Sequence, residues 1–373
     1  MDSGYSLRDY GRYLPRGYPV KHRKKVPFKP EAEVSPESED MVSEIRSMDE
    51  EMEFMLLSER DYRDLVVGAY ARNIHWSTRI EGNTLPYEGV HRIISRFVDG
   101  RKEDLHDKQV REIVNQATLS FNRGPFGMEH PVTGTHRVLM DGLDQAVPGA
   151  FRTSDVVVMS DSGWVKFIAC PKDHVVEEIR SLDRWDYGGY NEVVGPALKY
   201  HEFESIHPFA DGNGRTGRAL FEQWMEENEL LRCRNSGWAE ALLSDTGTYY
   251  DLLAYTDSVG DYGPFVDYVV ESVHRAYTDL YDAVSSKDLA KGMGRPLWSV
   301  AFAARGLGYF TVPYMAKETF LTEGQAAECL RDLQAMGLVE ESDTRYGEGY
   351  RFLDPFEDVR DRIRVEWCRS QRR

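Results

Sequence analysis

The sequence has few cysteines and no long apolar run, and both absences narrow the kinds of protein it can be. Only 4 of its 373 residues are cysteine, and none shows the C-x-x-C spacing of a zinc or redox motif. No stretch approaches the ~18 consecutive apolar residues of a membrane span, and the first residues lack an apolar signal region. We therefore expect a cytoplasmic protein with reduced thiols and no membrane contact.

Basic residues are also in short supply. Lys and Arg number 46 against 63 Asp and Glu, which gives a formal charge of −17. Such an excess of acid repels nucleic-acid phosphates at long range, so a protein or a small molecule is the expected partner. Disorder of the whole chain is excluded as well, because 41% of the residues are hydrophobic and 12% are aromatic.

Composition divides the chain into three stretches. Residues 1–40 combine a basic run at 21–25 with Pro, Glu and Ser and show no hydrophobic period, which predicts a disordered leader. Residues 41–290 carry apolar side chains at spacings near 3.6, which predicts a helical domain. Residues 291–373 follow a polar, Gly-rich joint and form a smaller unit.

The smaller unit has the expected element order of a winged helix, a small α+β domain. Helical patterns come first and two strand-like runs come last, at about 296–306, 312–319, 322–336, 337–340 and 350–353. The third helix carries two acids before its first base, Arg331. DNA contact through this unit is therefore not favoured, and a protein interaction or dimerisation is expected instead.

One β-prone segment interrupts the helical domain. Runs at 156–159 and 164–168 are separated by Ser160-Asp-Ser-Gly163, which predicts a β-hairpin. From these residues alone, a docking flap and a packed structural hairpin are both open.

The segment His207-Pro-Phe-Ala-Asp-Gly-Asn-Gly-Arg-Thr-Gly-Arg218 joins two helical patterns. Gly212 and Gly214 allow backbone N–H groups to approach a ligand, and the helix that follows adds partial positive charge. Arg215 and Arg218, three residues apart, offer forked donors to phosphate oxygens. The segment therefore predicts a polyphosphate site.

Two further side chains of the segment add chemistry to this site. Asp211 is a carboxylate that can hold Mg²⁺ between phosphates. His207 stands at the start of the loop and can accept a proton near neutral pH. Together with the phosphate donors, these residues predict phosphoryl or nucleotidyl transfer.

The same segment resembles the Fic family pattern H-x-F-x-D/E-G-N-G-R-x-x-R at every fixed position. Upstream, Ser77-Thr-Arg-Ile-Glu81-Gly82 resembles the inhibitory helix of this family, S/T-x-x-x-E-G/N. Residues 151–171 resemble its substrate-docking flap, and Tyr249 with Tyr250 resembles positions beside its adenine pocket. The resemblance covers about residues 41–280.

The resemblance implies a mainly α Fic fold, a helical core with a β-hairpin flap, and transfer of AMP from ATP to a Ser, Thr or Tyr hydroxyl of a protein docked at residues 153–171. His207 would be the general base and Asp211 the Mg²⁺ ligand. The nucleotide would be held by Gly212, Asn213, Gly214, Arg215, Arg218, Tyr249 and Tyr250. Glu81, with Ser77 and Gly82, would inhibit the enzyme by pairing with Arg218. Self-modification and a homodimer are expected.

Two alternatives to AMP transfer are open at this point. The same site could remove AMP from a modified protein, with Glu81 positioning a water. The chain could instead be a DNA-binding regulator in which the Fic core senses nucleotide and the winged helix contacts DNA.

Overall fold

The computed structural model describes residues 8–122, 131–160, 162–305, 307–344, 347–353 and 363. The chain separates into two units. Unit 1 consists of Met1–Asp49 and Ala69–Asp279, and unit 2 consists of Glu50–Gly68 and Leu280–Arg373. Three helices contribute residues to both units: α1 (Pro36–Met52), α2 (Glu59–Arg79) and α11 (Gly263–Ser286).

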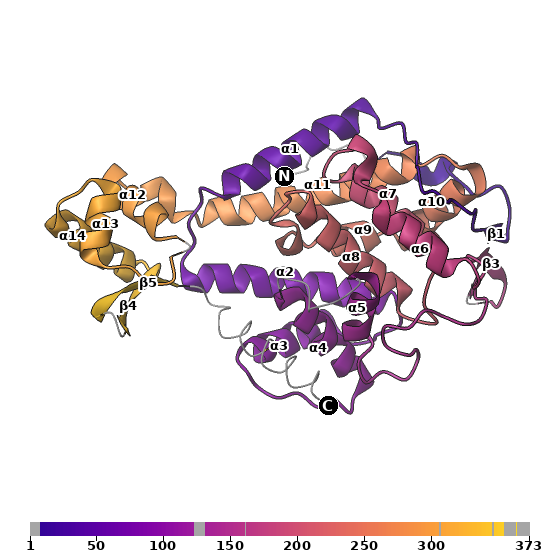
Figure 1. Cartoon of the computed structure of the whole chain (residues 1–373), viewed down its shortest axis with the longest axis horizontal. Helices are drawn as coiled ribbons and strands as arrows, with labels where there is room; N and C mark the ends of the chain where they lie inside the picture. The colour runs from indigo at the N-terminus through magenta and orange to yellow at the C-terminus, as the bar shows by residue number, and fades with distance from the viewer. Residues whose placement is uncertain are drawn as a thin grey trace. The chain divides into compact units, whose positions relative to one another are not determined.

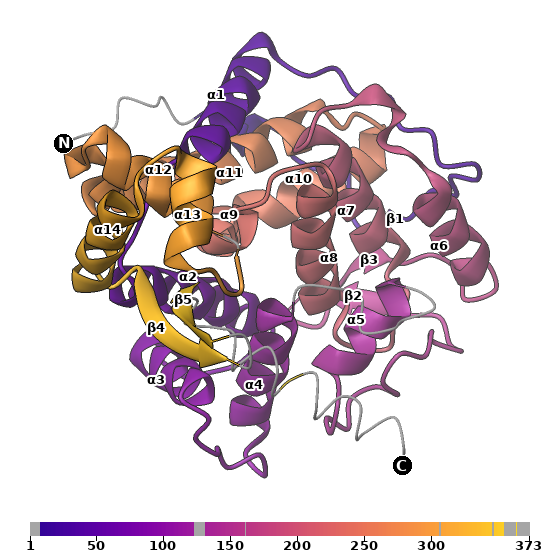
Figure 2. The ribbon, with the colours of Figure 1, turned by 60° about the vertical axis from the view of Figure 1, so that its left-hand side comes forward.

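Unit 1 is mainly helical, as expected, and α7 (Val194–Ile206) and α8 (Asn213–Glu227) lie side by side in it (Figures 1 and 2). Nearly every residue of α7 is buried, because other helices cover it on all sides. Its aromatic side chains Tyr200 and Phe203 are among the largest fully buried ones. The other helices and 3₁₀ turns of unit 1 are η1 (Tyr10–Arg12), α3 (Tyr87–Val98), α4 (Lys108–Phe121), α5 (Pro131–Leu139), α6 (Val175–Arg184), η2 (Tyr187–Gly189), η3 (Cys233–Asn235), α9 (Trp238–Leu243) and α10 (Thr246–Val259).

The β-hairpin lies where the sequence places it. Strands β2 (Val157–Met159) and β3 (Val165–Ile168) are antiparallel, and Gly163 takes the positive φ of 82° that the turn requires. A third strand, β1 (Val20–Lys21), pairs with β3 in parallel, so the sheet order is β1-β3-β2. One edge of β2 is therefore not covered by another strand of this sheet.

Residues 8–35 differ from the disordered leader expected for residues 1–40. They contribute β1 to the sheet, and Phe28 is 3% exposed. The basic run forms ion pairs with acids of later helices, Lys24 with Glu177 at 2.8 Å and Lys25 with Glu202 at 2.6 Å. Composition misleads here because the acids that neutralise this run lie far along the chain, on α6 and α7.

Unit 2 contains α12 (Arg295–Ala304), α13 (Val312–Thr319), α14 (Glu323–Ala335) and the antiparallel pair β4 (Val339–Thr344) and β5 (Gly347–Phe352), after η4 (Leu289–Gly292). These elements follow the expected order, and Thr322 begins α14 with a capping box. Leu56 packs in the same core as Val300 and Leu330. Unit 2 therefore includes residues 50–68, which the expected boundary near 291 leaves out, and its identity as a winged helix stays a prediction.

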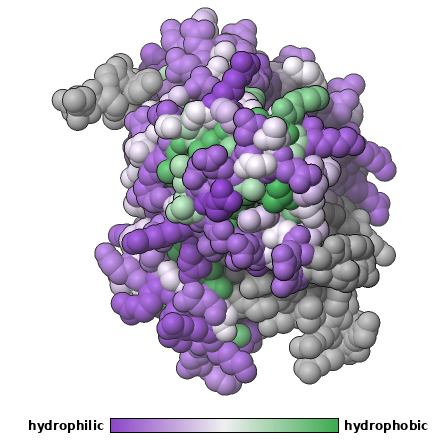
Figure 3. Space-filling view, turned by 90° about the vertical axis from the view of Figure 1, so that its left-hand side faces the viewer, coloured by the Kyte–Doolittle hydropathy of each residue, from purple (hydrophilic) through white to green (hydrophobic). Residues whose placement is uncertain are grey.

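Figure 3 looks onto the side of α12–α14 and shows hydrophobic residues gathered among hydrophilic ones. The exposed apolar side chains of this unit include Trp298, Phe320 and Met336. Phe320 is 95% exposed and ends α13 at a positive φ of 56°. Within the described ranges, no helix combines the length and the apolar character needed to cross a membrane.

Candidate active site

The motif loop, residues 207–214, joins α7 to α8, and hydrogen bonds among its own residues stabilise it. His207 ends α7 at a positive φ of 53°, and its N–H donates to the last turn of that helix at 3.0 Å. Asn213 closes the loop, because its Oδ1 accepts from Phe209 N at 2.8 Å and its Nδ2 donates to Phe209 O at 2.9 Å. Gly212, at φ 78°, leads directly into α8. The first N–H groups of that helix have no intrahelical acceptor, which suits them to an anion.

One ring nitrogen of His207 is held by the backbone, and the other carries the lone pair. Nδ1 lies 3.3 Å from the carbonyl oxygen of Glu204. A carbonyl oxygen only accepts, so we assign the proton to Nδ1 and the lone pair to Nε2. Burial lowers the pKa of His207 below its ordinary value. The imidazole is therefore neutral at pH 7, the form that can accept a proton at Nε2.

Arg215 forms hydrogen-bonded ion pairs with two carboxylates. Its Nη1 donates to Glu112 Oε1 at 3.1 Å, its Nη2 donates to Asp211 Oδ2 at 2.9 Å, and its side chain is 4% exposed. Arg215 and Arg218 were expected to face phosphate together. Arg215 instead takes Glu112 and Asp211 as its partners beside the loop.

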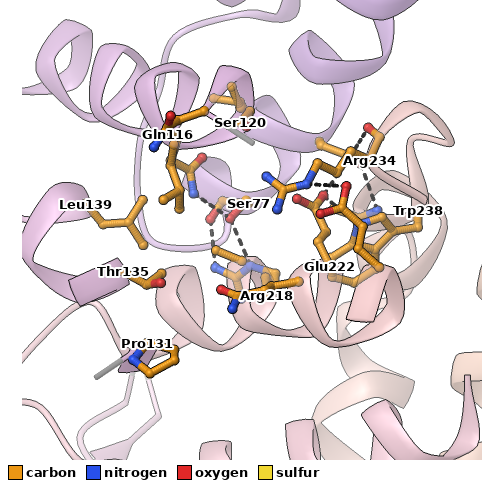
Figure 4. Close-up of a pocket in the computed structure, with 18 of the residues that line it drawn as sticks. Ser77, Gln116, Ser120, Pro131, Thr135, Leu139, Arg218, Glu222, Arg234 and Trp238 are labelled. Carbon is orange, nitrogen blue, oxygen red and sulfur yellow. Dashed lines mark hydrogen bonds and ion pairs between the residues drawn. The ribbon is translucent and has the colours of Figure 1, made fainter. Parts of the chain in front are cut away.

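Arg218 binds the Glu81 turn, residues 77–82 at the C-terminal end of α2. Its Nε donates to Ser77 Oγ at 3.0 Å, and its Nη2 donates to Ser77 O and to Glu81 Oε1, both at 2.8 Å. Gln116 Nε2 donates to the same Ser77 Oγ at 3.0 Å, which joins α4 to this network (Figure 4). The structure thus brings Arg218 to Ser77 and Glu81, which lie more than a hundred residues before it in the sequence.

Glu81 and Arg218 are both ionised in their ion pair, but the exposed fractions of their side chains differ. Burial alone would raise the pKa of Glu81, and the Arg218 guanidinium reverses this and lowers it. Burial would lower the pKa of Arg218, and Glu81 raises it, so both groups are charged at neutral pH. The Arg218 side chain is 4% exposed and that of Glu81 is 26% exposed.

Two glycines shape this contact. A Cβ at Gly214 would collide with Glu81 Oε1 and lie 2.8 Å from Arg218 Nη1, so a side chain there would push the ends of these two side chains aside. Gly82 has a positive φ of 96° directly after Glu81, beyond the last helical residue Arg79. The expectation that Gly82 ends this helix region is therefore consistent with its geometry.

A cavity of about 1160 Å³ lies over the motif loop, between the hairpin, the Glu81 turn and α10. Most of the side chains expected at the site line it, namely Glu81, His207, Asp211, Gly212, Asn213, Gly214, Arg218, Tyr249 and Tyr250. Ser77, Gly82 and Arg215 are expected site residues that do not line it in the part of the chain described here. Tyr249 is 1% exposed and shares a 2.6 Å hydrogen bond with Tyr200, whereas Tyr250 is 48% exposed.

The sequence around this loop matches a known family. Residues 129–225 match the profile described as the Fic/DOC family, and this stretch contains α5, α7, most of α8 and the whole motif loop. Residues 129–225 are a Fic/DOC family domain.

Curated relatives of the chain bear the name Fic as well. The chain is 27% identical over 276 residues to "Protein adenylyltransferase Fic" of Aedes aegypti, which covers 70% of the chain and 51% of the relative. It is 29% identical over 226 residues to the protein of the same name from Culex quinquefasciatus, covering 57% of the chain and 42% of the relative. The chain thus spans about half the length of the curated relatives it matches.

Solved structures share the fold of the Fic domain and its surroundings. A Fic family protein from Desulfovibrio desulfuricans has a TM-score of 0.59 and 23% identity, covering 87% of the chain and 98% of that structure. Fic-1 from C. elegans has a TM-score of 0.50 and 20% identity, covering 67% of the chain and 73% of that structure. At these identities the likeness establishes the fold, a Fic fold with a hairpin.

Three side chains at the Fic site were missed from the sequence. Glu112 and Gln116 lie one turn apart on α4 and contact Arg215 and Ser77, and no local signal links them to the motif. Glu204 lies one turn before His207, a spacing that could have placed it at the site. Burial raises the pKa of Glu204 to about 8, with Arg218 opposing the rise and Glu81 adding to it.

A second cavity, of about 490 Å³, adjoins the Glu81 turn (Figure 4). Ser77, Gln116 and Arg218 form part of its wall, and Glu222 with Trp238 forms another part. Trp238 Nε1 donates to Glu222 Oε1 at 2.7 Å there. The network that holds Arg218 therefore borders this second cavity.

Proposed function

We propose that this chain is a protein adenylyltransferase that transfers AMP from ATP to a Ser, Thr or Tyr hydroxyl and is held inactive by Glu81. The observation that carries the proposal is the neutral His207 ring, with its lone pair at Nε2, at a cavity that also contains Arg218 and the N-terminus of α8. The names of the curated relatives support the same activity.

His207 acts as the general base in the proposed reaction. Nε2 takes the proton of the target hydroxyl while the hydroxyl oxygen forms a bond to the α-phosphorus of ATP. The bond from that phosphorus to its bridging oxygen breaks, and pyrophosphate leaves with the electron pair. The hydrogen bond from Nδ1 to Glu204 O orients the ring and fixes the tautomer that this step needs.

The phosphates are held by fixed dipoles and one guanidinium. The N–H groups at Gly212 and Gly214 and the start of α8 offer partial positive charge without rearrangement. Arg218 supplies a full charge once Glu81 leaves it. Asn213 contributes through its backbone only, because its side-chain amide is bonded to Phe209.

Asp211 fits the role of a Mg²⁺ ligand. Its Oδ2 accepts from Arg215 at 2.9 Å, and its side chain is 36% exposed at the cavity. Mg²⁺ is usually bound in such sites through one or two carboxylates, with phosphate oxygens and waters as its other ligands. When bound, the ion would supply positive charge to the phosphates of ATP.

Inhibition follows from the competition for Arg218. The guanidinium is 4% exposed, and three of its N–H groups donate to Ser77 and Glu81, so a phosphate must compete with Glu81 for it. ATP can then bind with its α-phosphate out of line with the attacking oxygen. Because Glu81 is 26% exposed, its side of the pair is the one that can release.

We propose that the target docks along the hairpin flap, residues 153–171. The edge strand β2 offers backbone groups for an added strand, and Val157 and Met159 are 45% and 61% exposed on it. Arg152 ties the base of the flap to the motif loop, since its Nε donates to His207 O at 2.8 Å. A docked strand would therefore be placed relative to His207. The expected homodimer and self-modification stay predictions, and so does the expectation that DNA contact through the smaller unit is not favoured.

The proposal is tested with α-labelled ATP and Mg²⁺. The full-length protein, its Glu81→Gly variant and the control variant Glu88→Gly, at an exposed acid seven residues further on, are each incubated with candidate target proteins. We expect label on protein with Glu81→Gly at ~10 times the wild-type rate or more, since 1.4 kcal/mol in the competent population is already tenfold. The Glu88→Gly control should behave as wild type.

Two further measurements show whether the enzyme adds AMP or removes it. γ-Labelled ATP should leave no label on protein, because that phosphate departs in pyrophosphate. If Glu81→Gly adds no label while wild type removes AMP from a pre-labelled protein, the chain is a de-AMPylating enzyme and the proposal is wrong.

A further inference from the structure

Three side chains with metal-ligand chemistry meet in unit 1, outside the site described above. His22 comes from the N-terminal segment, Cys170 from the end of the flap, and Glu178 from α6. The side chains of His22 and Glu178 are each 1% exposed, and Cys170 is 0% exposed. His22 Nε2 lies 2.7 Å from Glu178 Oε2, and Cys170 Sγ lies 3.3 Å from Glu178 Oε1.

The hydrogen-bond partners of His22 indicate that a cation lies between its imidazole and Glu178. Ser205 Oγ donates its proton to Asp257 Oδ1 at 2.8 Å. At its 2.7 Å contact with His22 Nδ1 the same oxygen must therefore accept, which puts the ring proton on Nδ1. The lone pair of a neutral ring at Nε2 then faces a carboxylate oxygen, and two acceptors at 2.7 Å repel unless a positive charge joins them.

We propose that this cation is a zinc ion held by His22, Cys170 and Glu178. A thiolate, an imidazole and a carboxylate are the ligands that zinc takes in proteins. The carboxylate of Glu178 faces both other side chains, so it joins Nε2 and Sγ as the third protein ligand and leaves the fourth position open. Ligand atoms around tetrahedral zinc lie ~3.3–3.8 Å apart, so the His22 and Glu178 atoms need to separate by only about half an ångström.

Outer contacts of the kind that orient zinc ligands are in place. Ser205 and Asp257 fix the His22 ring, as described, and Lys25 N donates to Glu178 Oε2 at 3.4 Å. Arg152 donates to the carbonyl oxygen of Cys170. The ion would fasten the N-terminal segment to the flap and to α6, while Ser205, two residues before His207 on α7, holds the His22 ring.

Zinc content of the full-length protein is the first test. The protein is produced with zinc in the medium, purified without chelator and analysed by elemental mass spectrometry. We expect about one zinc per chain, and a loss of most of it in Cys170→Ser. Cys233→Ser is the matched control, because Cys233 is equally buried in the same unit but lies outside this cluster, and it should keep its zinc.

Cobalt gives a second readout that does not depend on activity or on the proposed transferase function. Co²⁺ added to chelator-treated protein should produce a thiolate-to-cobalt absorption band that Cys170→Ser abolishes and Cys233→Ser retains. No cysteine is among the described residues that line the Asp211 cavity, so Co²⁺ bound there gives no such band.

Thermal melting curves show whether the variants are folded. Zn²⁺ should raise the melting temperature of chelator-treated wild type, and His22→Gln should remove that shift while still melting cooperatively. Wild type that carries no zinc, gives no thiolate band and shows no shift would overturn the proposal. The cation between His22 and Glu178 would then be a proton.

Discussion

The motif loop and the Glu81 turn face each other across one cavity, but different numbers of contacts hold them. The loop is fixed by the Asn213 amide on Phe209, by the backbone cap at His207, and by Arg152 and His136, which donate to its carbonyl oxygens. The Glu81 turn reaches α8 through Arg218, which comes from a distant part of the sequence. The loop that carries His207 is thus held by several buried contacts, whereas Glu81 is held by one ion pair that can release.

Burial explains the difference. Asn213 is 2% exposed, so its hydrogen bonds are protected from water, while Glu81 is 26% exposed. Water near a partly exposed carboxylate weakens an ion pair, and exposed pairs contribute only ~0–1 kcal/mol. The turn can therefore be displaced by a ligand that binds Arg218 better, and the loop cannot.

The largest effect on the transfer rate should come from removing His207, the proposed general base in the motif loop. In the Glu81→Gly background, His207→Ala should lower AMP transfer by ~10²–10⁴ and leave ATP binding nearly unchanged, because the phosphates are held by other groups. Initial rates and ATP affinity of the two proteins test this. Since burial lowers the pKa of His207, the parent rate should hold as pH falls to about 6.5 and decline only below the lowered pKa. Near-normal transfer by the Ala variant would show that His207 is not the base.

Asn213→Ala tests whether the loop is fixed by its own side chain. The variant leaves the N–H and C=O of Phe209 without their partners in a buried place, so unfolding free energy should fall by ~1–3 kcal/mol. Denaturant unfolding measures it. Asn228→Ala is the control, because that amide makes its bond to Trp224 O at the end of α8. An equal loss in both variants would contradict a special role for Asn213.

Arg218→Ala in the Glu81→Gly background tests the releasable pair. The gain from Glu81→Gly depends on a guanidinium free to bind phosphate, so the second change should lower the rate by about tenfold, toward the wild-type level. Lysine at the same position restores charge but not the forked geometry, and should recover part of the rate. A double variant as fast as Glu81→Gly would mean that Arg218 takes no part.

Glu204→Gln examines the second carboxyl beside Arg218 through stability against pH. With a folded pKa of about 8, Glu204 keeps its proton in the folded protein between about pH 4.5 and 8 and releases it on unfolding. Raising the pH through that window therefore lowers stability, by about 1 kcal/mol for a side chain that keeps some exposure. Thermal melts of wild type should show this slope, and those of Glu204→Gln should lack it. Parallel pH profiles would contradict the raised pKa.

The smallest effect is expected at Gln116. Gln116→Leu removes one hydrogen bond to Ser77 Oγ but leaves both Arg218 bonds to Ser77, so the turn should loosen only slightly. Because both Arg218 bonds stay, we take the lower end of the ~0.5–1.5 kcal/mol of a net hydrogen bond, which predicts a basal transfer rate about twofold higher. Gln109→Leu, on the same helix but bonded to Thr84, serves as the control. A rise as large as that of Glu81→Gly would place the lock at Ser77 rather than at Glu81.

Local signals in the sequence were enough for the elements near the site. The Ser160–Gly163 turn between β-prone runs predicted the hairpin, and the two glycines of the motif predicted a loop entering a helix. Each of these depends on residues a few positions apart. Residues 8–35 show the opposite case, since their partners Glu177, Glu178 and Glu202 cannot be read from the composition of the segment.

Local sequence is sufficient for the helical class, the hairpin, the order of elements in unit 2 and the motif loop, because propensity, turn chemistry and spacing act over a few residues. The pairing of Arg218 with Glu81 was predicted through the family resemblance. The packing of distant elements is what turns Arg215 to Glu112 and Asp211 and brings His22, Cys170 and Glu178 together. A charged or ligating side chain takes whichever partner the packing of distant helices brings within about 3 Å, and no local pattern in the chain records that choice.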